Sequence, residues 1–132
     1  MNQLIIDTSA YSAFRRGDIV VEPYFTSTHE ILVPTIVLGE LRAGFCSSRY
    51  QVENERLLQK FLDLSNVSTI NIQDSTTKEF GKLYKELRGL GKPIGQNDLW
   101  IVSLVREHRV PLLTLDQDFQ NIRNIEIMSV SR

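Results

Sequence analysis

Cysteine is almost absent from the sequence, and two kinds of segment are missing altogether. Cys46 is the single cysteine, so the chain can form no internal disulfide. No stretch approaches the roughly 18 uninterrupted apolar residues that a membrane-spanning helix requires. The first residues also lack the basic start, apolar stretch and cleavage site of a secretory signal. We therefore expect a protein of the cytoplasm that does not associate with membranes.

An excess of charge of either sign is also absent. The formal net charge is −1, so any contact with nucleic acid must come from local basic patches and not from the overall field. His29 and His108 are the only histidines, and neither has metal-ligand spacing. A length of 132 residues with 42% hydrophobic residues is ordinary for one packed domain. We expect residues 1–132 to form a single domain.

Short β-branched runs alternate with helical patterns along the chain. The runs are bounded by polar residues, proline or glycine, which predicts strands at residues 4–6, 31–33, 67–72, 110–115 and 125–128. Helical spacing and end signals predict helices at residues 9–16, 34–45, 52–64, 75–90 and 98–107. Strands that alternate with helices form a parallel sheet with helices on both faces. The sequence therefore predicts an α/β fold.

Two aspartates follow predicted strands. Asp7 comes directly after "LII", and Asp116 comes directly after "LLTL". Because ligands of such sheets bind outside the carboxyl ends of the strands, we expect both carboxylates at the same edge of the sheet. Each also has a structural alternative, since Asp7 could cap the following helix and Asp116 or Asp118 could be a turn residue.

Two further acids lie on predicted helices that are otherwise apolar. Glu40 falls on the apolar face of "PTIVLGELRAGF", and Asp98 stands at the head of "DLWIVSLV". A carboxylate in apolar surroundings is costly unless it is paired, protonated or bound to a cation. The structural alternatives are a pairing of Glu40 with Arg42 and a helix-cap role for Asp98 beside Asn97. Convergence of all four acids would instead form a site for a hard cation such as Mg²⁺.

The four acidic segments together resemble the motifs of the PIN-domain ribonucleases. The segments are "IIDTSA", "LGELRAG", "IGQNDLWIVSLV" and "LLTLDQDF". Their order and separation are similar to those in the toxin subunits of VapBC-type toxin–antitoxin modules. The resemblance implies a PIN-like three-layer sandwich with a roughly five-stranded parallel sheet. It also implies an endoribonuclease that depends on Mg²⁺ or Mn²⁺, a cognate antitoxin protein as inhibitor, and a homodimer.

The resemblance also implies roles for individual residues. The candidate catalytic and metal-binding acids are Asp7, Glu40, Asp98 and Asp116. Glu40 would hold either a second ion or the attacking water. The candidate supporting residues are Ser9, Thr114, Asn97 and Asp118, and Asp118 remains an alternative to Asp116 as the fourth acid. The cation would polarise the phosphoryl oxygen, activate a water and stabilise the leaving 3′ oxygen.

Several basic side chains are candidate contacts to the RNA backbone. They are Arg15, Arg16 and Arg42 near the acids, and Lys82 and Lys85 in a helical run with Lys78, Lys92 and Arg88. A solvated helix face is the alternative for the lysines, because Glu79 and Glu86 interrupt the run.

Aromatic residues near the first helices are candidates for a partner surface. Tyr11, Phe14, Tyr24 and Phe25 could present apolar area to a second copy or to the antitoxin, or they could belong to the core.

Two other functions are alternatives to the toxin. A PIN-like nuclease of RNA processing would use the same acids outside any toxin pair. A receiver-like regulatory domain that binds Mg²⁺ would need a phosphoacceptor after the third strand and a lysine on a later strand. The segment "STINIQD" offers only Asp74, and the later strands contain no lysine.

Overall fold

A sheet of five parallel strands lies at the centre of the computed structural model, which describes residues 2–91 and 94–129. The strands lie in the order β3-β2-β1-β4-β5, and every neighbouring pair is parallel. They are β1 (Gln3–Ile6), β2 (Glu30–Pro34), β3 (Val67–Ile70), β4 (Leu112–Thr114) and β5 (Ile127–Ser129). All five predicted strands are present, although β3 and β4 are shorter than the apolar runs that predicted them.

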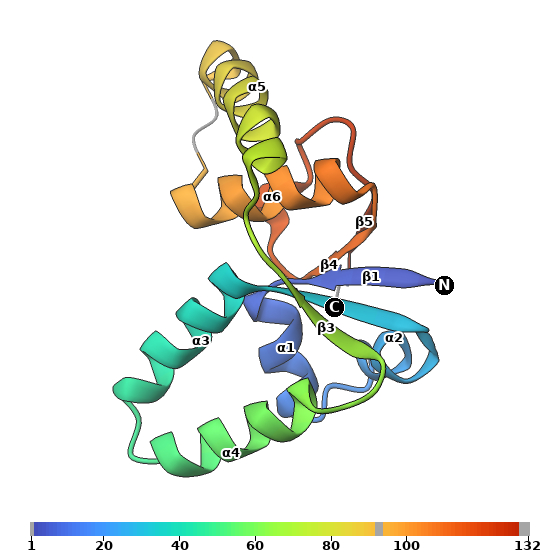
Figure 1. Ribbon diagram of the computed structural model, residues 1–132, viewed down its shortest axis with the longest axis vertical. Coiled ribbons are helices and arrows are strands. Elements are labelled where there is room, and N and C mark those ends of the chain that lie inside the picture. Colours follow the sequence, from blue (N-terminus) through green and yellow to red (C-terminus); the bar gives the residue numbers. More distant parts are fainter. Residues whose placement is uncertain (1, 92–93, 130–132) are drawn as a thin grey trace.

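Helices cover both faces of the sheet (Figure 1). On one side lie α1 (Thr8–Arg15), α2 (Glu22–Ser27), α3 (Thr35–Cys46) and α4 (Gln51–Leu62). On the other side lie α5 (Asp74–Leu90) and α6 (Gln96–His108), and a short 3-10 turn, η1 (Gln117–Phe119), precedes β5. The predicted three-layer α/β sandwich is therefore confirmed. Helix α2 was not predicted, because six residues are too few to show a helical period.

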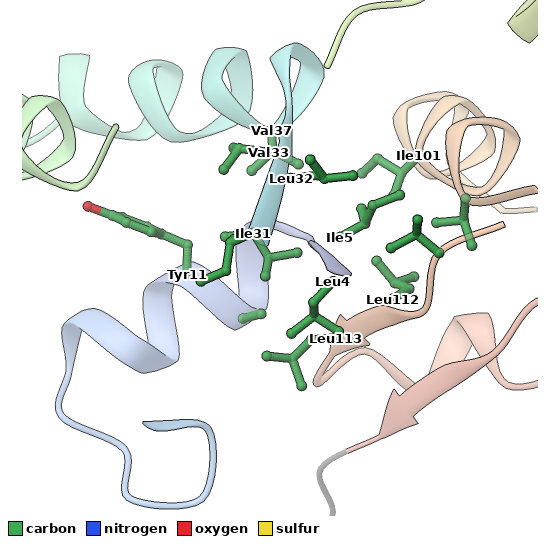
Figure 2. Close-up of a cluster of buried hydrophobic side chains, with 14 of the residues drawn as sticks. Leu4, Ile5, Tyr11, Ile31, Leu32, Val33, Val37, Ile101, Leu112 and Leu113 are labelled. Carbon is green, nitrogen blue, oxygen red and sulfur yellow. The ribbon is translucent and has the colours of Figure 1, made fainter. Parts of the chain in front are cut away.

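The core is formed by aliphatic side chains of the central strands. Leu4, Ile5 and Leu112 are fully buried, and Figure 2 shows them between the helices of the two faces. Val37 of α3 and Ile101 of α6 pack into the same cluster. Strands covered on both faces are apolar along their whole length, which is why these segments stood out in the sequence.

The aromatic residues of the first two helices belong to the core. The exposed fractions of Tyr11 and Phe25 are 3% and 6%, and Phe14 stacks on Phe25 with 4.2 Å between ring centroids. Phe14 and Tyr24 are partly buried against the same cluster. Tyr11 and Phe25 are therefore not available to a partner, whereas Phe14 and Tyr24 keep part of their surface exposed, and their contribution to a partner surface stays a prediction.

The parallel strands deliver their carboxyl ends to one edge of the sheet. Helix α1 begins there after β1, α3 begins after β2, and η1 follows β4. Figure 1 shows the first turn of α6 on the same side of the molecule. Asp7, Asp98 and Asp116 lie in these connections or in the first turn that follows them, and Glu40 is the sixth residue of α3. Within the two described ranges, no helix combines the length and the apolar character needed to cross a membrane.

Candidate metal centre

Asp7 joins the end of β1 to the start of α1. It is the N-cap of α1, and its Oδ1 accepts a hydrogen bond from the backbone N–H of Ala10 at 2.9 Å. The hydroxyl of Ser9 donates to the same oxygen at 2.7 Å, and the hydroxyl of Thr114 donates to Oδ2. The carboxylate is 5% exposed, and this burial raises its pKa although the hydrogen bonds oppose the shift. Asp7 is thus both a helix cap and a buried acid at the sheet edge.

Ser9 and Thr114 connect the two strand ends. The N–H of Leu115 donates to Ser9 Oγ at 3.0 Å, and the N–H of Asp116 donates to Thr114 Oγ1 at 3.0 Å. Each hydroxyl therefore donates to the Asp7 carboxylate while it accepts from the loop that follows β4. This network fixes the position of Asp7 relative to Asp116.

Asp116 and Asp118 differ in how they face the other acids. Asp116 is half-buried at the N-cap of η1, where its Oδ1 accepts from the N–H of Asp118 at 2.9 Å. Its charge contributes to the raised pKa values of both Asp7 and Asp98. Asp118 is exposed, and its charge raises the pKa of Asp98 less than the charges of Asp116, Glu40 and Asp7 do. Thr114 links Asp116 to the acid cluster, because its hydroxyl donates to Asp7 while it accepts from the N–H of Asp116.

Glu40 is held between the first residues of two other helices. The hydroxyl of Thr8 donates to Glu40 Oε1 at 2.7 Å, and the side-chain amide of Asn97 donates to Oε2 at 3.4 Å. Arg42 does not pair with Glu40. Sequence reasoning missed Thr8, because nothing local predicts a contact between residues 32 positions apart.

Asp98 is the third residue of α6 and is half-buried. Within residues 2–91 and 94–129, its carboxylate has no hydrogen-bond or ion-pair partner. Burial and the charges of Asp116, Glu40, Asp7 and Asp118 raise its pKa to about 6. A carboxylate without a donor and surrounded by like charges favours a bound cation.

The donor set fits a hard divalent cation. Every candidate ligand is a carboxylate oxygen, which Mg²⁺ and Mn²⁺ prefer. In the described part of the chain, no three His, Cys, Asp or Glu side chains stand close enough to enclose a metal ion by themselves. Mg²⁺ usually takes one or two carboxylates and keeps several waters, so spaced acids suit it. Structural Zn²⁺, which takes four close ligands, does not suit this arrangement.

Among the described residues, none of the three candidate arginines forms a hydrogen bond or ion pair with the four acids. Arg15 and Arg16 are at the far end of α1, about 12 Å along the helix from Asp7 at the usual rise per residue. Arg15 donates to the hydroxyl of Tyr11 at 3.1 Å. The guanidinium of Arg42 bonds both carboxylate oxygens of Glu55 on α4, at 3.0 and 2.9 Å.

The candidate lysines lie on α5. Lys82 and Lys85 are exposed, and Lys82 Nζ is 3.8 Å from Glu79. Lys92 lies outside the described residues. The contribution of these side chains to RNA binding remains a prediction.

Comparisons with known proteins point to one family. The sequence model of the PIN domain matches residues 4–125, which include all four acids. Ribonuclease VapC2 of Rickettsia felis is 33% identical over 96 residues, which cover 72% of this chain and 70% of the relative. Ribonuclease VapC5 of Mycobacterium tuberculosis is 23% identical over 129 residues, which cover 96% and 94% of the two chains.

Solved structures share the fold. A chain of VapBC2 from Rickettsia felis, bound to a DNA fragment from their promoter, matches with a TM-score of 0.85 at 26% identity, covering 96% of this chain and 98% of that one. A chain of DNA-bound VapBC from Salmonella typhimurium matches with a TM-score of 0.84 at 21% identity and covers 98% of both chains. The five-stranded sheet and its helices therefore have the arrangement of these proteins.

Proposed function

Because the chain belongs to the PIN-domain family, we propose that it is a Mg²⁺- or Mn²⁺-dependent endoribonuclease and the toxin of a toxin–antitoxin pair. The observation that carries the catalytic proposal is the convergence of Asp7, Glu40, Asp98 and Asp116 at one edge of the sheet. VapC ribonucleases among the relatives and VapBC complexes among the structural neighbours support the toxin role. In this proposal residues 1–132 act as one PIN-like domain, in the cytoplasm where the RNA is.

Asp7, Asp98 and Asp116 would hold the cation, one or two of them directly and the others through the waters that Mg²⁺ keeps. When bound, the cation polarises the scissile phosphate and stabilises the leaving 3′ oxygen. Ser9 and Thr114 keep the Asp7 carboxylate in one orientation through their donated hydrogen bonds. Both hydroxyls favour the ionised form of Asp7, which is the form that binds a metal.

Glu40 would hold a second ion or orient the attacking water. Its Oε1 accepts a hydrogen bond of 2.7 Å from the hydroxyl of Thr8, whereas the hydrogen bond from the side-chain amide of Asn97 to Oε2 is long, at 3.4 Å. Oε2 can therefore accept a hydrogen bond from a water and take up its proton as the water attacks. In-line attack at phosphorus leaves a 5′ phosphate and a 3′ hydroxyl.

Cleavage of total RNA by the purified protein tests the nuclease proposal. We expect cleavage in millimolar Mg²⁺ that stops in EDTA, with 5′ phosphates at the mapped ends. Asp98→Asn and Asp116→Asn should each reduce the rate by orders of magnitude, because each removes a ligand charge. Asp118→Asn is the matched control and should cleave like the wild type. Cleavage that survives both EDTA and Asp98→Asn would contradict the proposal.

Expression in cells tests the toxin role separately from the chemistry. We expect the protein alone to stop growth, and co-expression of a small protein encoded next to it to restore growth and to co-purify. We also expect a homodimer by sedimentation. A protein that cleaves RNA but leaves growth unaffected, with no co-purifying partner, would favour the alternative of an RNA-processing nuclease outside a toxin pair.

A further inference from the structure

We propose that three aromatic rings on α5 and α6 stack a base of single-stranded RNA. The rings belong to Tyr84, Phe80 and Trp100, and we refer to them as the aromatic ladder. The inference rests on the proposed ribonuclease function, and it identifies how the substrate strand is held beside the acids. The ligand of the aromatic ladder is one nucleobase of the substrate RNA, in a nucleotide that lies a few positions along the strand from the scissile bond.

The rings of the aromatic ladder are nearly parallel. The Phe80 and Trp100 centroids are 4.0 Å apart with 25° between the ring planes. The Phe80 and Tyr84 centroids are 6.3 Å apart with 20° between the planes. Phe80 and Trp100 are half-buried, whereas Tyr84 is 50% exposed and ends the series. Bases of any sequence stack on exposed aromatic faces, so a base on Tyr84 would add a fourth plane to the series.

The helix surface next to Tyr84 is open. Gly81 is three residues before Tyr84 and therefore neighbours it on the surface of α5. A Cβ atom placed at Gly81 would meet no atom within 4 Å. A flat ligand can therefore approach the ring without displacing a side chain at this position.

Cations line the outer side of the ladder. Lys78 and Lys85 are seven residues apart and share a face of α5, and Arg88 is one turn beyond Lys85. All three are exposed, and none has an ion-pair partner in the part of the chain that the structure describes. Arg88 also neighbours Tyr84, four residues earlier. A base on Tyr84 would thus bring its phosphates to a row of positive charge, which stabilises RNA binding.

The glutamates of α5 do not offset this charge. Helical rotation of about 100° per residue places Glu79 and Glu86 on the side of α5 away from Tyr84. Glu86 is paired with Arg106 at 2.8 Å, and Glu79 lies 3.8 Å from Lys82. Lys82 neighbours both Lys78 and Lys85 on α5, so the solvated-face interpretation applies to the whole row of lysines, although among the described residues only Lys82 has an acidic partner.

The ladder and the acid centre share the first turns of α6. Asp98 and Trp100 are the third and fifth residues of that helix. The start of α6 at Gly95 has no side-chain cap, so its N–H groups and the positive end of its dipole favour a phosphate there. Figure 1 shows α5 crossing α6 and extending away from the sheet. Helical rotation of about 200° places Asp98 and Trp100 on different sides of α6, so we infer that the RNA strand passes over the start of this helix between the acids and the ladder.

Tryptophan fluorescence reports on the ladder, because Trp100 is the only tryptophan and stacks on Phe80, the ring next to Tyr84. The wild-type protein is titrated in EDTA with a ten-nucleotide single-stranded RNA, which binds without being cut. We expect quenching of Trp100, binding about tenfold weaker for Tyr84→Ala, and binding close to wild type for Tyr84→Phe. Tyr50→Ala is the matched control, since Tyr50 is 56% exposed at the start of α4, across the sheet from α5.

An abasic oligonucleotide of the same length separates base stacking from phosphate contact. We expect it to bind the wild type as weakly as the RNA binds Tyr84→Ala, with no further loss when both changes are combined. An equal loss for RNA and abasic strand on Tyr84→Ala would overturn base stacking. Conversion of a dimer to a monomer by Tyr84→Ala in sedimentation would overturn it too, since the ladder would then be a contact between copies of the chain.

A cleavage assay in Mg²⁺ distinguishes failure of the ladder from failure of the nuclease. Tyr84→Ala should raise KM for RNA about tenfold and leave kcat near wild type, because it removes a contact remote from the reacting atoms. Wild-type KM and wild-type RNA binding for Tyr84→Ala, in a protein that cleaves RNA, would overturn the ladder alone. A wild type that binds the oligonucleotide but never cuts RNA would overturn the nuclease proposal and leave the binding result standing.

Discussion

Asp98 is a carboxyl group whose ionisation is unfavourable in the folded chain. Its pKa rises from an ordinary value of 3.8 to about 6, first through burial and then through four neighbouring acids. The folded state therefore binds this proton more tightly than the unfolded state does. As a consequence, the contribution of Asp98 to the free energy of unfolding falls as the pH rises from about 4 through 6.

We predict that Asp98→Asn raises the melting temperature in EDTA at pH 7.5, by on the order of a few degrees. The variant removes a charge that the neighbouring acids repel, so its advantage should shrink when the melt is repeated at pH 4.5. Asp118→Asn is the control and should show a much smaller dependence on pH, because Asp118 is exposed. An advantage of equal size at both pH values would contradict the electrostatic explanation.

The hydroxyl of Thr8 holds the carboxylate of Glu40 in position. Thr8→Val keeps the shape of the side chain but removes the donor to Glu40 Oε1. We expect kcat to fall about tenfold or more with KM for RNA unchanged, because the binding surface is intact while Glu40 turns. The Mg²⁺ concentration for half-maximal thermal stabilisation should rise as well, which is a readout independent of activity.

Two matched variants control for the change at Thr8. Thr8→Ser retains the hydroxyl and should restore both readouts. Thr35→Val changes the first residue of α3, just as Thr8→Val changes the first residue of α1. Thr35 is exposed, and its side chain makes no hydrogen bond to any residue that the structure describes. A loss of kcat in Thr35→Val equal to that in Thr8→Val would exclude a specific role for the bond to Glu40.

At the scale of the element, the end of β1 and the start of α1 meet at Asp7. The cap bond to the N–H of Ala10 is one that asparagine can also accept. We predict that Asp7→Asn melts within about 2 °C of the wild type in EDTA but loses cleavage by orders of magnitude. Asp7→Ala should lose cleavage and also about 1 kcal/mol of stability, because it removes the cap. A loss of stability without loss of cleavage in Asp7→Asn would identify Asp7 as a cap only.

The elements themselves were largely predictable, for physical reasons. The central strands are buried on both faces, so their apolar runs are continuous, and the end of α5 was visible because Gly91 takes a positive φ of 64° that favours glycine. The short helix α2 was not predictable from periodicity. Asp7 and Asp116 were predicted together because parallel strands end at one edge of a sheet, whereas Glu40 and Asp98 were predicted because they stand on otherwise apolar helices. The pairing of Arg42 with Glu55 could not be predicted, because Glu55 lies on a helix whose packing no local pattern reveals, and the role of Arg42 in RNA binding stays a prediction.

The whole molecule concentrates its acids where the starts of three helices meet one sheet edge. Asp7 begins α1, Asp98 begins α6, Asp116 begins η1, and Glu40 reaches the same place from α3. Helix starts favour negative charge, which offsets part of the repulsion between these carboxylates. The rest of the repulsion persists in the folded chain, as the raised pKa of Asp98 shows. A cation bound only by the folded chain would relieve it.

Because a bound cation would reduce the repulsion between these carboxylates, Mg²⁺ should raise the melting temperature of the whole domain. Mg²⁺ that binds the native state and not the unfolded chain stabilises the protein by an amount that grows with the logarithm of its concentration. We expect the melting temperature of the wild type to rise by about 3 °C or more in 10 mM Mg²⁺, relative to NaCl of equal ionic strength. Asp98→Asn and Asp116→Asn should lose most of this shift, because each removes a ligand, whereas Asp118→Asn should keep it. An equal shift in all three variants would mean that Mg²⁺ acts through general screening, and the acids at the sheet edge would then not form a metal centre.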